Sequence, residues 1–493
     1  MKFYSTRGKD VAENAAEAIT KGLAADGGLF VPESFPCVKD DLDKLLGMDY
    51  AERAAFIIGK YLEEYDAEEL LSACKKAYGQ FEEGDAAPVV KLDDDLFILE
   101  LFHGPTLAFK DIALTLLPYL LRKGSDITGV KDEILILVAT SGDTGKAALS
   151  GFADADGIKI MVFYPSDGVS DMQKLQMRSQ SGENVNVVGV KGNFDDCQNA
   201  VKKIFSDARF NALLKEKGVV LSSANSINFG RLVPQISYYF SAYFDLVNAG
   251  EINLGEEINF VVPTGNFGNI LAGYYAKKMG LPINKLVCAS NSNNVLTEFF
   301  ADGTYDKNRE FYKTSSPSMD ILISSNLERL VYEESGRNAQ LTARRMEELK
   351  KTGVYTVTEE ERGRMEKVFF AGFCDEEDCS AEIRDIFEEY GYVPDTHTAV
   401  ALAVCDEFRS FTETACKTVV LSTASPYKFP QSVYKAITGK TIKDAFTASD
   451  KLFAESACPV PDAITALKTA KERFLSVVEK EDAEKAVIEF IEK

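Results

Sequence analysis

The stretch INFVVPTGNFGN, residues 258–269, decides the fold of this chain. Its first half is a near-continuous apolar run, and its second half is a glycine-rich loop that leads into the helical pattern ILAGYYAKKMG. The same order recurs at residues 133–152, where EILILVA leads into TSGDTG and then into KAALSGF. Apolar runs separated by helical stretches are typical of a parallel sheet that is covered on both faces. The sequence therefore predicts an α/β fold.

The rest of the chain divides into three parts by pattern. Residues 1–90 look largely helical, as in DYAERAAFIIGKYLEEY, and residues 441–493 look like a helical tail. Between them, at residues 91–440, further apolar runs of the kind described above recur as LFILELF, IKIMVFY, NVNVVGV, GVVLSS, KLVCAS and TVVLSTA. We therefore expect a helical N-terminal domain, an α/β core and a helical C-terminal tail with these boundaries.

Composition narrows the class of protein. The 493 residues are 45% hydrophobic and 27% charged, and the formal net charge is −22. Nucleic-acid binding needs a basic footprint, so no nucleic-acid partner is expected. No apolar run is long enough to span a membrane, and the start MKFYSTRGKD lacks the apolar core of a signal peptide, so we expect a cytoplasmic protein without a membrane partner. Nine cysteines without a CxxC pair, together with two histidines, predict no metal site.

Three of the predicted strands run into polar loops, at residues 140–145, 263–269 and 422–430. Ligands of open α/β sheets bind outside the carboxyl ends of the strands, so these loops are candidates for one site. Gly265 and Gly268 let the backbone approach a ligand, and the helix that follows favours an anion such as a phosphate. The alternative is a tight turn with no ligand.

The other two motifs are also polar turns. TSGDTGK is not a nucleoside-triphosphate loop, because its glycines are too close and no Ser or Thr follows Lys146. It is predicted to present three polar side chains to a ligand, those of Ser141, Asp143 and Thr144. The motif SSANSINFGR, residues 222–231, places Arg231 after a run of Ser and Asn, which suits a phosphate. The alternative there is a plain connection in which Asn225 caps a helix. The two histidines, His103 and His397, are interpreted as structural.

Lys110, in LFHGPTLAFKD, is the strongest candidate for a chemically reactive residue. It follows an apolar run and stands at the start of the helical stretch DIALTLLPYLL. Apolar surroundings and a helix N-terminus both disfavour an ammonium group. A neutral lysine amine attacks carbonyl groups and forms Schiff bases. The alternative is a lysine whose amine reaches water, but a phosphate loop nearby favours a ligand that has both a carbonyl and a phosphate, as pyridoxal phosphate does.

These motifs, with others, carry a resemblance to a known family. The chain resembles the threonine synthases, pyridoxal-phosphate enzymes of fold type II, the tryptophan-synthase-β-like fold. The match runs nearly end to end through YSTRG, DGGLFVPE, FHGPTLAFKD, ATSGDTGKAA, FDDCQ, NSINFGRLVPQ, PTGNFGNILAGYYAKKMGLP, SPSMDILISSNLERL, DTHTAVA and LSTASPYKF. It implies two parallel-sheet domains with the cofactor in the cleft between them, the smaller and mobile one at about residues 130–225, plus the helical N-terminal domain.

The resemblance also implies roles for single residues. Lys110 is then the catalytic lysine, which holds pyridoxal phosphate as a Schiff base. Thr423 lies where the family hydrogen-bonds the pyridine nitrogen, and Asp143 lies where related enzymes place a residue beside the 3-hydroxyl group. The loop that holds the cofactor phosphate comprises Gly265, Asn266, Phe267, Gly268 and Asn269. The substrate-phosphate pocket is matched by Thr140, Ser141, Thr144, Asn225, Ser226 and Arg231.

The implied reaction converts O-phospho-L-homoserine and water to L-threonine and phosphate, by a protein that is a monomer or a homodimer. One alternative is a phospho-lyase that yields 2-oxobutyrate and ammonia from the same substrate. Another is a non-catalytic binding protein of the same family. The chain departs from the family's TAHPAKF by reading TASPYKF, with Ser425 and Tyr427, a change that affects hydrogen bonding next to Thr423.

Overall fold

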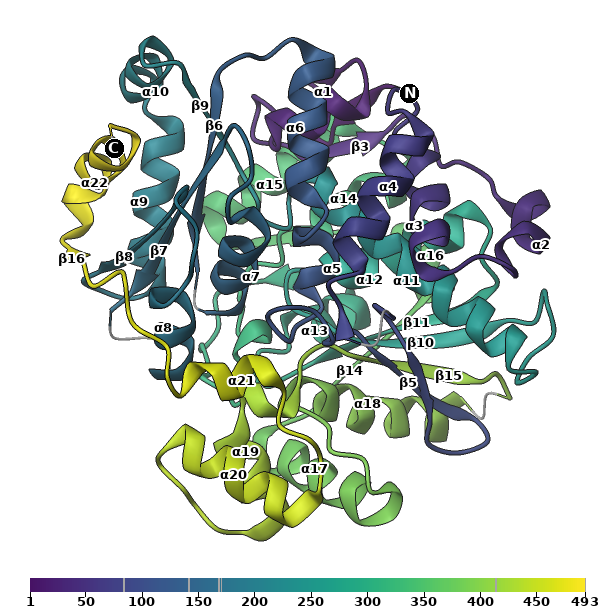
Figure 1. Cartoon of the computed structure of the whole chain (residues 1–493). Coiled ribbons are helices and arrows are strands. Elements are labelled where there is room, and N and C mark those ends of the chain that lie inside the picture. Colours follow the sequence, from purple (N-terminus) through teal and green to yellow (C-terminus); the bar gives the residue numbers. More distant parts are fainter. Residues whose placement is uncertain (83–84, 141, 167–168, 170, 413–414, 493) are drawn as a thin grey trace.

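The structure is a computed structural model, and it confirms the predicted α/β fold with two mainly parallel sheets (Figure 1). It describes residues 1–82, 85–140, 142–166, 169, 171–412 and 415–492. In that part of the chain no helix is both long enough and apolar enough to cross a membrane.

The larger sheet has the order β14-β11-β10-β15-β5-β4. Its strands are β14 (Phe369–Phe373), β11 (Ile283–Ser290), β10 (Ile258–Pro263), β15 (Thr418–Ser422), β5 (Leu96–Glu100) and β4 (Val89–Lys91). All pairs are parallel except β4 with β5. In Figure 1 helix α18 (Thr396–Thr412) lies below this sheet, and α11 (Phe229–Asn248) and α12 (Gly268–Met279) lie above it. The residues of β10 and β15 are fully buried, as expected for a sheet covered on both faces.

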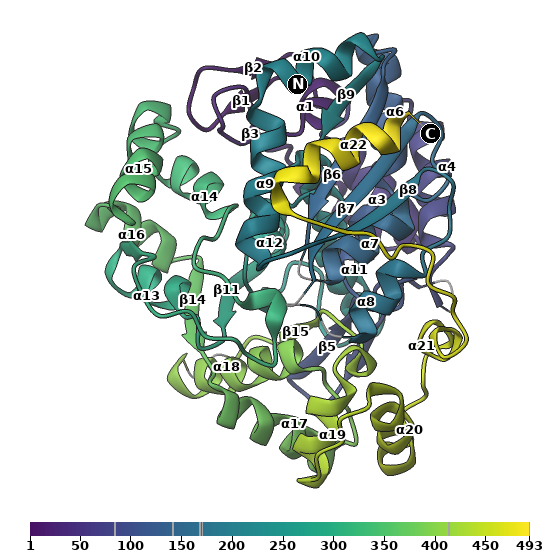
Figure 2. The ribbon, with the colours of Figure 1, turned by 90° about the vertical axis from the view of Figure 1, so that its left-hand side faces the viewer.

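The smaller sheet is parallel throughout and has the order β16-β8-β7-β6-β9. Its strands are β16 (Val477–Val478), β8 (Val185–Val190), β7 (Ile158–Pro165), β6 (Glu133–Ala139) and β9 (Val219–Ser222). The helices around it are α7 (Asp143–Phe152), α8 (Asp171–Arg178), α9 (Phe194–Ser206), α10 (Ala208–Glu216) and α22 (Ala483–Ile491). Figure 2 shows that the C-terminal segment runs from the lower helices up along this sheet, where β16 and α22 join it.

The N-terminal part combines helices with a small antiparallel sheet of the order β2-β1-β3. Its elements are β1 (Phe3–Ser5), β2 (Val11–Ala12), α1 (Ala15–Lys21), β3 (Phe30–Pro32), α2 (Leu42–Leu45), α3 (Tyr50–Gly59) and α4 (Ala67–Tyr78). Strands of two or three residues are too short to show a pattern, which is why the sequence predicts only helices here. An ion pair of 2.6 Å between Arg53 and Asp245 links α3 to α11 of the core.

The other elements connect or flank these sheets. The helices are α5 (Lys110–Leu114), α6 (Leu117–Thr128), α13 (Val295–Asp302), α14 (Leu327–Glu334), α15 (Ala339–Thr352), α16 (Glu359–Glu366), α17 (Glu376–Tyr390), α19 (Pro430–Thr438), α20 (Ala445–Ser456) and α21 (Asp462–Leu467). An antiparallel pair is formed by β12 (Thr304–Asp306) and β13 (Val354–Thr356), and single 3₁₀ turns are η1 (Lys39–Asp41), η3 (Pro317–Met319), η4 (Pro426–Lys428) and η5 (Lys480–Asp482).

Candidate active site

Lys110 stands where a strained loop turns into a helix. The loop contains Leu107, whose backbone has a left-handed φ of +62°. This conformation costs an L-residue about 1–2 kcal/mol, and such strain gathers at functional sites. The carboxylate of Asp111 fixes the loop by accepting hydrogen bonds from the N–H and the hydroxyl group of Thr106, at 2.7 and 2.6 Å. Helix α5 then begins at Lys110, as the sequence predicts.

The amine of Lys110 is buried among polar side chains. The residue is 9% exposed, and its Nζ lies 3.3 Å from Oγ of Ser318 and 3.8 Å from a carboxylate oxygen of Asp143. Burial lowers the pKa of Lys110; the Asp143 carboxylate opposes this effect, and the positive charges of Lys428 and Arg231 add to it. The net shift is downward, and it favours the neutral, nucleophilic amine.

The loop after β15 lies alongside the loop before Lys110. The N–H of Phe109 donates to the carbonyl oxygen of Thr423 at 2.9 Å, and the amine of Lys428 donates to the carbonyl oxygen of Thr106 at 2.8 Å. Thr423 is buried, and its hydroxyl group has no hydrogen-bond partner among the described residues. The structure therefore brings Thr423 and Lys110 into one site and leaves a neutral hydroxyl group free to bind a ligand.

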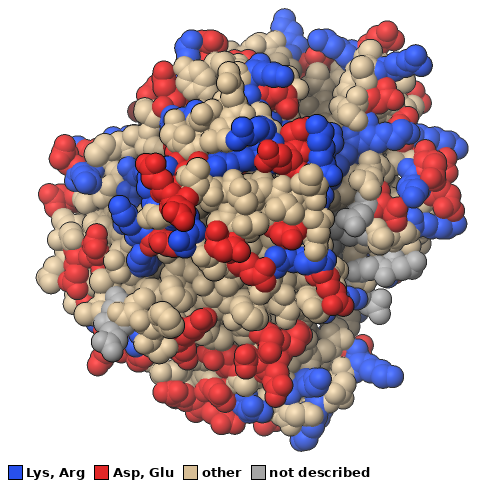
Figure 3. Space-filling view, turned by 180° about the vertical axis from the view of Figure 1, so that it is seen from behind, with Lys and Arg blue, Asp and Glu red and all other residues tan. Residues whose placement is uncertain are grey.

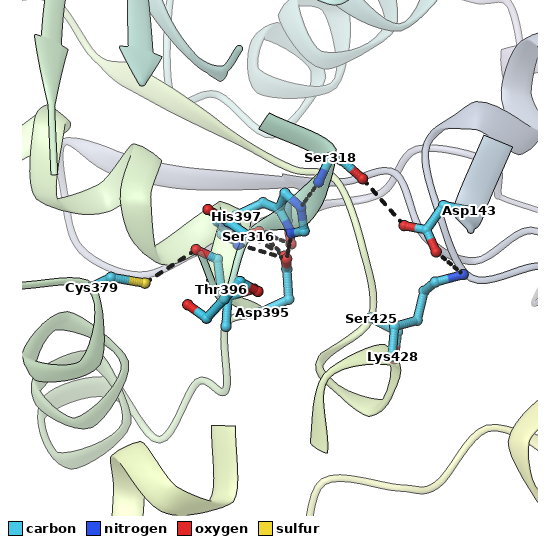
Figure 4. Close-up of polar contacts among 12 residues, drawn as sticks. Asp143, Ser316, Ser318, Cys379, Asp395, Thr396, His397, Ser425 and Lys428 are labelled. Atoms are coloured by element: carbon cyan, nitrogen blue, oxygen red, sulfur yellow. Dashed lines mark hydrogen bonds and ion pairs between the residues drawn. The ribbon is translucent and has the colours of Figure 1, made fainter. Parts of the chain in front are cut away.

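Asp143 joins the two sheets through an ion pair (Figure 4). Its carboxylate lies 3.1 Å from Nζ of Lys428, and the two side chains are 4% and 2% exposed. Burial alone would raise the pKa of Asp143, but the charges of Lys428 and Lys110 outweigh burial and lower that pKa well below its usual range. Asp143 starts α7, beside the smaller sheet, whereas Lys428 follows β15 of the larger sheet. The ion pair thus connects two of the loops that the sequence predicts to form one site.

Lys428 is a site residue that the sequence reasoning missed. It stands between Tyr427 and Phe429 in TASPYKF, so it shares with Lys110 the pattern of a lysine beside aromatic residues. That pattern was the signal available in the sequence. The departures from the family motif have clear local contacts: Oγ of Ser425 accepts from the N–H of Tyr427 at 3.3 Å, and the buried Tyr427 hydroxyl donates to the carbonyl oxygen of Cys458. Tyr427 therefore anchors the C-terminal segment.

Two carbonyl groups of the glycine-rich loop at residues 265–269 accept hydrogen bonds from the segment before α14. The hydroxyl group of Ser324 donates to the carbonyl oxygen of Gly265 at 2.7 Å, and the Asn326 side chain donates to that of Asn266 at 3.0 Å. Phe267 precedes α12 with a left-handed φ of +61°. The first N–H groups of a helix have no partner within it, so the start of α12 at Gly268 offers donors to an anion.

Two observations test whether this loop fits a phosphate. Oδ1 of Asn269 accepts from the hydroxyl groups of Tyr238 and Tyr239, at 2.5 and 2.9 Å, while its Nδ2 is buried without a partner among the residues that the structure describes. A Cβ atom at Gly265 would lie 2.8 Å from the carbonyl oxygen of Ser318, so only glycine fits there. Anion sites show both features: a buried hydrogen-bond donor without a partner, and a space beside the backbone that a side chain would fill.

Arg231 is buried near Lys110, and among the described residues only part of its guanidinium group has a hydrogen-bond partner. It lies in the first turn of α11 and is 3% exposed; its Nη1 donates to the carbonyl oxygen of Ala224 at 2.5 Å, and its Nε has no partner in the described part of the chain. Burial lowers the pKa of Arg231 to about 10. The cap of α11 is Asn228, whose side chain accepts from the N–H of Gly230, so the alternative interpretation of Asn225 as the cap is wrong.

The other residues predicted to bind the substrate phosphate differ in what they contact. The hydroxyl group of Thr140 accepts from the N–H groups of Gly142 and Gly145 and so holds the turn before α7. Ser226 accepts from Asn326 at 3.1 Å, which places it beside the glycine-rich loop. Asn225 and Thr144 are half-buried, the former in the connection before α11 and the latter in the first turn of α7. Ser141 lies outside the described residues.

A second contact that the sequence reasoning missed involves His397. Its Nε2 accepts a hydrogen bond of 3.2 Å from the N–H of Ser318, and its Nδ1 lies 2.8 Å from the carboxylate of Asp395. Ser318 in turn touches Lys110 and Asp143. A lone histidine has no sequence signal that connects it to a serine 79 residues away.

Taken together, these residues fit pyridoxal phosphate. An amine with a lowered pKa suits its aldehyde, the start of α12 suits its phosphate, and the free hydroxyl group of Thr423 suits a ring nitrogen. In the described residues no group of three or more His, Cys, Asp or Glu side chains is arranged to hold a metal ion.

Comparisons with known proteins show which families the chain is similar to. Three family models match the chain. They are described as "Threonine synthase N terminus" over residues 2–78, "Pyridoxal-phosphate dependent enzyme" over residues 86–367, and "Threonine synthase, C-terminal" over residues 398–491.

Single relatives are similar over most of the chain. A protein named threonine synthase from Pseudomonas aeruginosa is 37% identical over 466 residues, which cover 93% of this chain and 95% of the relative. A Homo sapiens protein named threonine synthase-like 1 is 42% identical over 450 residues, 89% of this chain but only 60% of the relative's length. The solved structure of pyridoxal-phosphate-bound threonine synthase from Brucella melitensis superposes with a TM-score of 0.88 at 37% identity, covering 100% of this chain and 98% of that one.

Proposed function

The chain belongs to the threonine synthase family of pyridoxal-phosphate-dependent lyases, and from this premise we propose that it converts O-phospho-L-homoserine and water to L-threonine and phosphate. The observation that carries the proposal is the buried amine of Lys110. Its lowered pKa, and its place between Asp143 and Ser318, suit covalent binding of an aldehyde followed by proton transfer.

Pyridoxal phosphate, when bound, supplies an electron sink for negative charge that develops on the substrate. Lys110 would hold the cofactor through its Nζ until the amine of the substrate takes its place. The freed Nζ would then remove the proton from Cα of the substrate and a proton from Cβ, so that phosphate can leave from Cγ. One of these two protons would be delivered to Cγ, which becomes the methyl group of threonine. A water molecule would then add its hydroxyl group at Cβ, its other proton passing to the released phosphate, and Lys110 would return the second proton to Cα before threonine leaves. The downward pKa shift favours the unprotonated Nζ, which is the form that accepts a proton.

The two phosphates would be bound in different ways. The cofactor phosphate would be held by the backbone N–H groups of Gly265–Asn269 at the start of α12, with the amide nitrogen of Asn269 as a further donor. The substrate phosphate must enter and leave, which suits side-chain donors. Arg231 is proposed as its main ligand because its Nε is buried and, among the described residues, has no hydrogen-bond partner. The other proposed contacts are Thr140, Ser141, Thr144, Asn225 and Ser226.

Thr423 and Asp143 would tune the ring. The hydroxyl group of Thr423 is a neutral partner for the pyridine nitrogen and would leave that nitrogen unprotonated, in contrast to a carboxylate. Asp143 is proposed to lie beside the 3-hydroxyl group, where its ion pair with Lys428 keeps it ionised.

We further propose that the chain works as the parts expected from its sequence: residues 1–90, a catalytic core at 91–440 and a tail at 441–493. The smaller part, at about 130–225, would move over the site and exclude water until it is needed. No nucleic-acid or membrane partner is proposed, in line with the net charge of −22 and the acidic side chains that gather on the lower part of the face in Figure 3. We expect a cytoplasmic monomer or homodimer.

Incubation of the purified, pyridoxal-phosphate-loaded protein with O-phospho-L-homoserine tests the proposal. Threonine and phosphate should form in equal amounts, and Lys110→Ala should abolish both while the protein stays folded. 2-Oxobutyrate and ammonia as the main products would assign the phospho-lyase activity instead. No product at all, from a protein that binds the cofactor on Lys110, would assign the non-catalytic role.

A further inference from the structure

The buried pair of His397 and Asp395 lies beside Ser318 (Figure 4), and Ser318 in turn contacts Lys110. His397, in the first turn of α18, is 3% exposed, and Asp395, just before that helix, is fully buried. One oxygen of the Asp395 carboxylate accepts from both the backbone N–H and Nδ1 of His397, each at 2.8 Å. The other oxygen accepts from the N–H and the hydroxyl group of Thr398. The imidazole is therefore held in a fixed orientation.

These contacts define the proton position on the imidazole. A carboxylate only accepts hydrogen bonds, so Nδ1 of His397 must carry a proton. Nε2 faces the backbone N–H of Ser318 at 3.2 Å, and an N–H only donates, so Nε2 must be unprotonated. His397 is thus a neutral imidazole. Asp395 fixes the orientation of its ring, and the ring in turn holds the backbone N–H of Ser318 in place.

Ser318 touches three parts of the site. Its Oγ lies 3.3 Å from Nζ of Lys110 and 3.4 Å from a carboxylate oxygen of Asp143. Its carbonyl oxygen lies 2.8 Å from the position that a Cβ atom would take at Gly265, at the start of the phosphate loop. A small displacement of Ser318 would therefore move a partner of the reactive amine and the wall of the phosphate loop together.

We propose that Asp395 and His397 are positioning residues that act through Ser318, whose hydroxyl group directs the amine of Lys110 toward the cofactor aldehyde and the substrate protons. The inference rests on the proposed function, because it assumes that Lys110 carries pyridoxal phosphate. The inference assigns His397 a role beyond stabilising α18. Asp395 accepts hydrogen bonds from the first turn of that helix, whereas the ring of His397 accepts a hydrogen bond from Ser318, which lies outside the helix and in the site.

A double-mutant cycle between Ser318 and His397 tests this chain of contacts. The variants are Ser318→Ala, His397→Leu and the double variant, each as the full chain. Two quantities are measured: the rate constant at which the visible absorbance band grows when pyridoxal phosphate is added to cofactor-depleted protein, and kcat and KM for O-phospho-L-homoserine. Loss of one hydrogen bond in this chain should slow cofactor capture and kcat about tenfold. The part of the His397→Leu effect that passes through the Ser318 hydroxyl group should vanish in the Ser318→Ala background, whereas a part that passes through the Ser318 backbone remains, so the two single effects should combine to clearly less than their product.

Two further variants separate positioning from simple support of the fold. His397→Gln can place an amide oxygen where Nε2 accepts, so it should stay within about threefold of the wild type. His103→Leu is the matched control, since His103 bonds to Glu100 at 2.8 Å outside the site, and it should match the wild type. If His397→Leu does not fold, Asp395→Asn replaces it in the cycle, with a slowing of about threefold that shrinks in the Ser318→Ala background.

The outcomes distinguish this inference from the proposed function. A wild-type protein that forms no visible band with pyridoxal phosphate overturns both. A wild-type band on Lys110, combined with single effects that multiply to about a hundredfold in the double variant, overturns only the chain from His397 through Ser318. A His397→Gln variant as slow as His397→Leu, at equal thermal stability, overturns it as well.

Discussion

Replacing Lys428 by Met should destabilise the protein, because it leaves the buried carboxylate of Asp143 with one charged partner fewer. The charged atoms of the pair are 3.1 Å apart. At an effective dielectric constant of about 20, charges at that distance attract each other by about 5 kcal/mol. Removing one partner of such a pair costs about 3–5 kcal/mol, since the other charge stays buried. Lys110, 3.8 Å from Asp143, compensates in part, so we expect the lower end, about 3 kcal/mol.

The assay is the midpoint of thermal unfolding of cofactor-depleted protein, in which the Lys110 amine is free. With an unfolding entropy of about 2 cal/mol/K per residue, 3 kcal/mol corresponds to a fall of about 3 °C for a chain of this length. Lys428→Met combined with Asp143→Leu should recover most of that loss. Arg345→Met is the matched control: it breaks the buried pair of Arg345 with Glu361, at 2.8 and 2.6 Å, and should lower the midpoint without weakening cofactor binding.

The pH dependence provides a second check of the Lys428→Met reasoning. In the wild type, burial would raise the pKa of Asp143, but Lys428 and Lys110 lower it below the unfolded value. Its contribution to stability is therefore complete at neutral pH and is lost only as the pH falls through the folded pKa. In Lys428→Met this pKa rises, so protonation relieves the buried charge. The difference between the two midpoints should be largest near pH 8 and shrink toward about pH 5. A constant difference, or no difference, would refute the reasoning.

Three further substitutions test separate parts of the site. Gly265→Val should weaken pyridoxal-phosphate binding at least about tenfold in an absorbance titration, because its Cβ would meet the Ser318 carbonyl oxygen at 2.8 Å; unchanged affinity would mean that the phosphate lies elsewhere. Thr423→Asp should shift the visible spectrum and raise the share of 2-oxobutyrate, since a carboxylate favours a protonated pyridine; an unchanged spectrum and product ratio would remove Thr423 from the ring nitrogen. Arg231→Leu should lower kcat/KM about a hundredfold or more, as expected for two lost charge-assisted hydrogen bonds, and keep the visible band; loss of the cofactor would contradict this role.

The core strands could be read from the sequence almost residue for residue. EILILVA and INFVVP coincide with β6 and β10, because both are long apolar runs that end at a glycine-containing loop. The strand β14 was missed, since FFAGF is short and lies between two helices in an acidic stretch. The tail was expected to be helical, yet it includes β16, whose two residues find their place only by pairing with β8.

The site was predictable where one segment carries the signal, and it was not where two distant segments must meet. The environment of Lys110 was evident from its apolar neighbours, and burial does lower its pKa. The contacts of Lys428 with Asp143 and of His397 with Ser318 depend on how loops from different strands converge. No local sequence pattern encodes how close two loops from different strands lie, so these contacts can be seen only in the folded structure.

Isotope labelling tests the central claim most directly. The loaded protein is incubated with O-phospho-L-homoserine in water enriched in ¹⁸O, and the products are analysed by mass spectrometry. If phosphate leaves from Cγ and water adds at Cβ, threonine carries one ¹⁸O atom in its hydroxyl group and the released phosphate carries none. Homoserine together with ¹⁸O-labelled phosphate would mean cleavage of the phosphorus–oxygen bond, and would contradict the account.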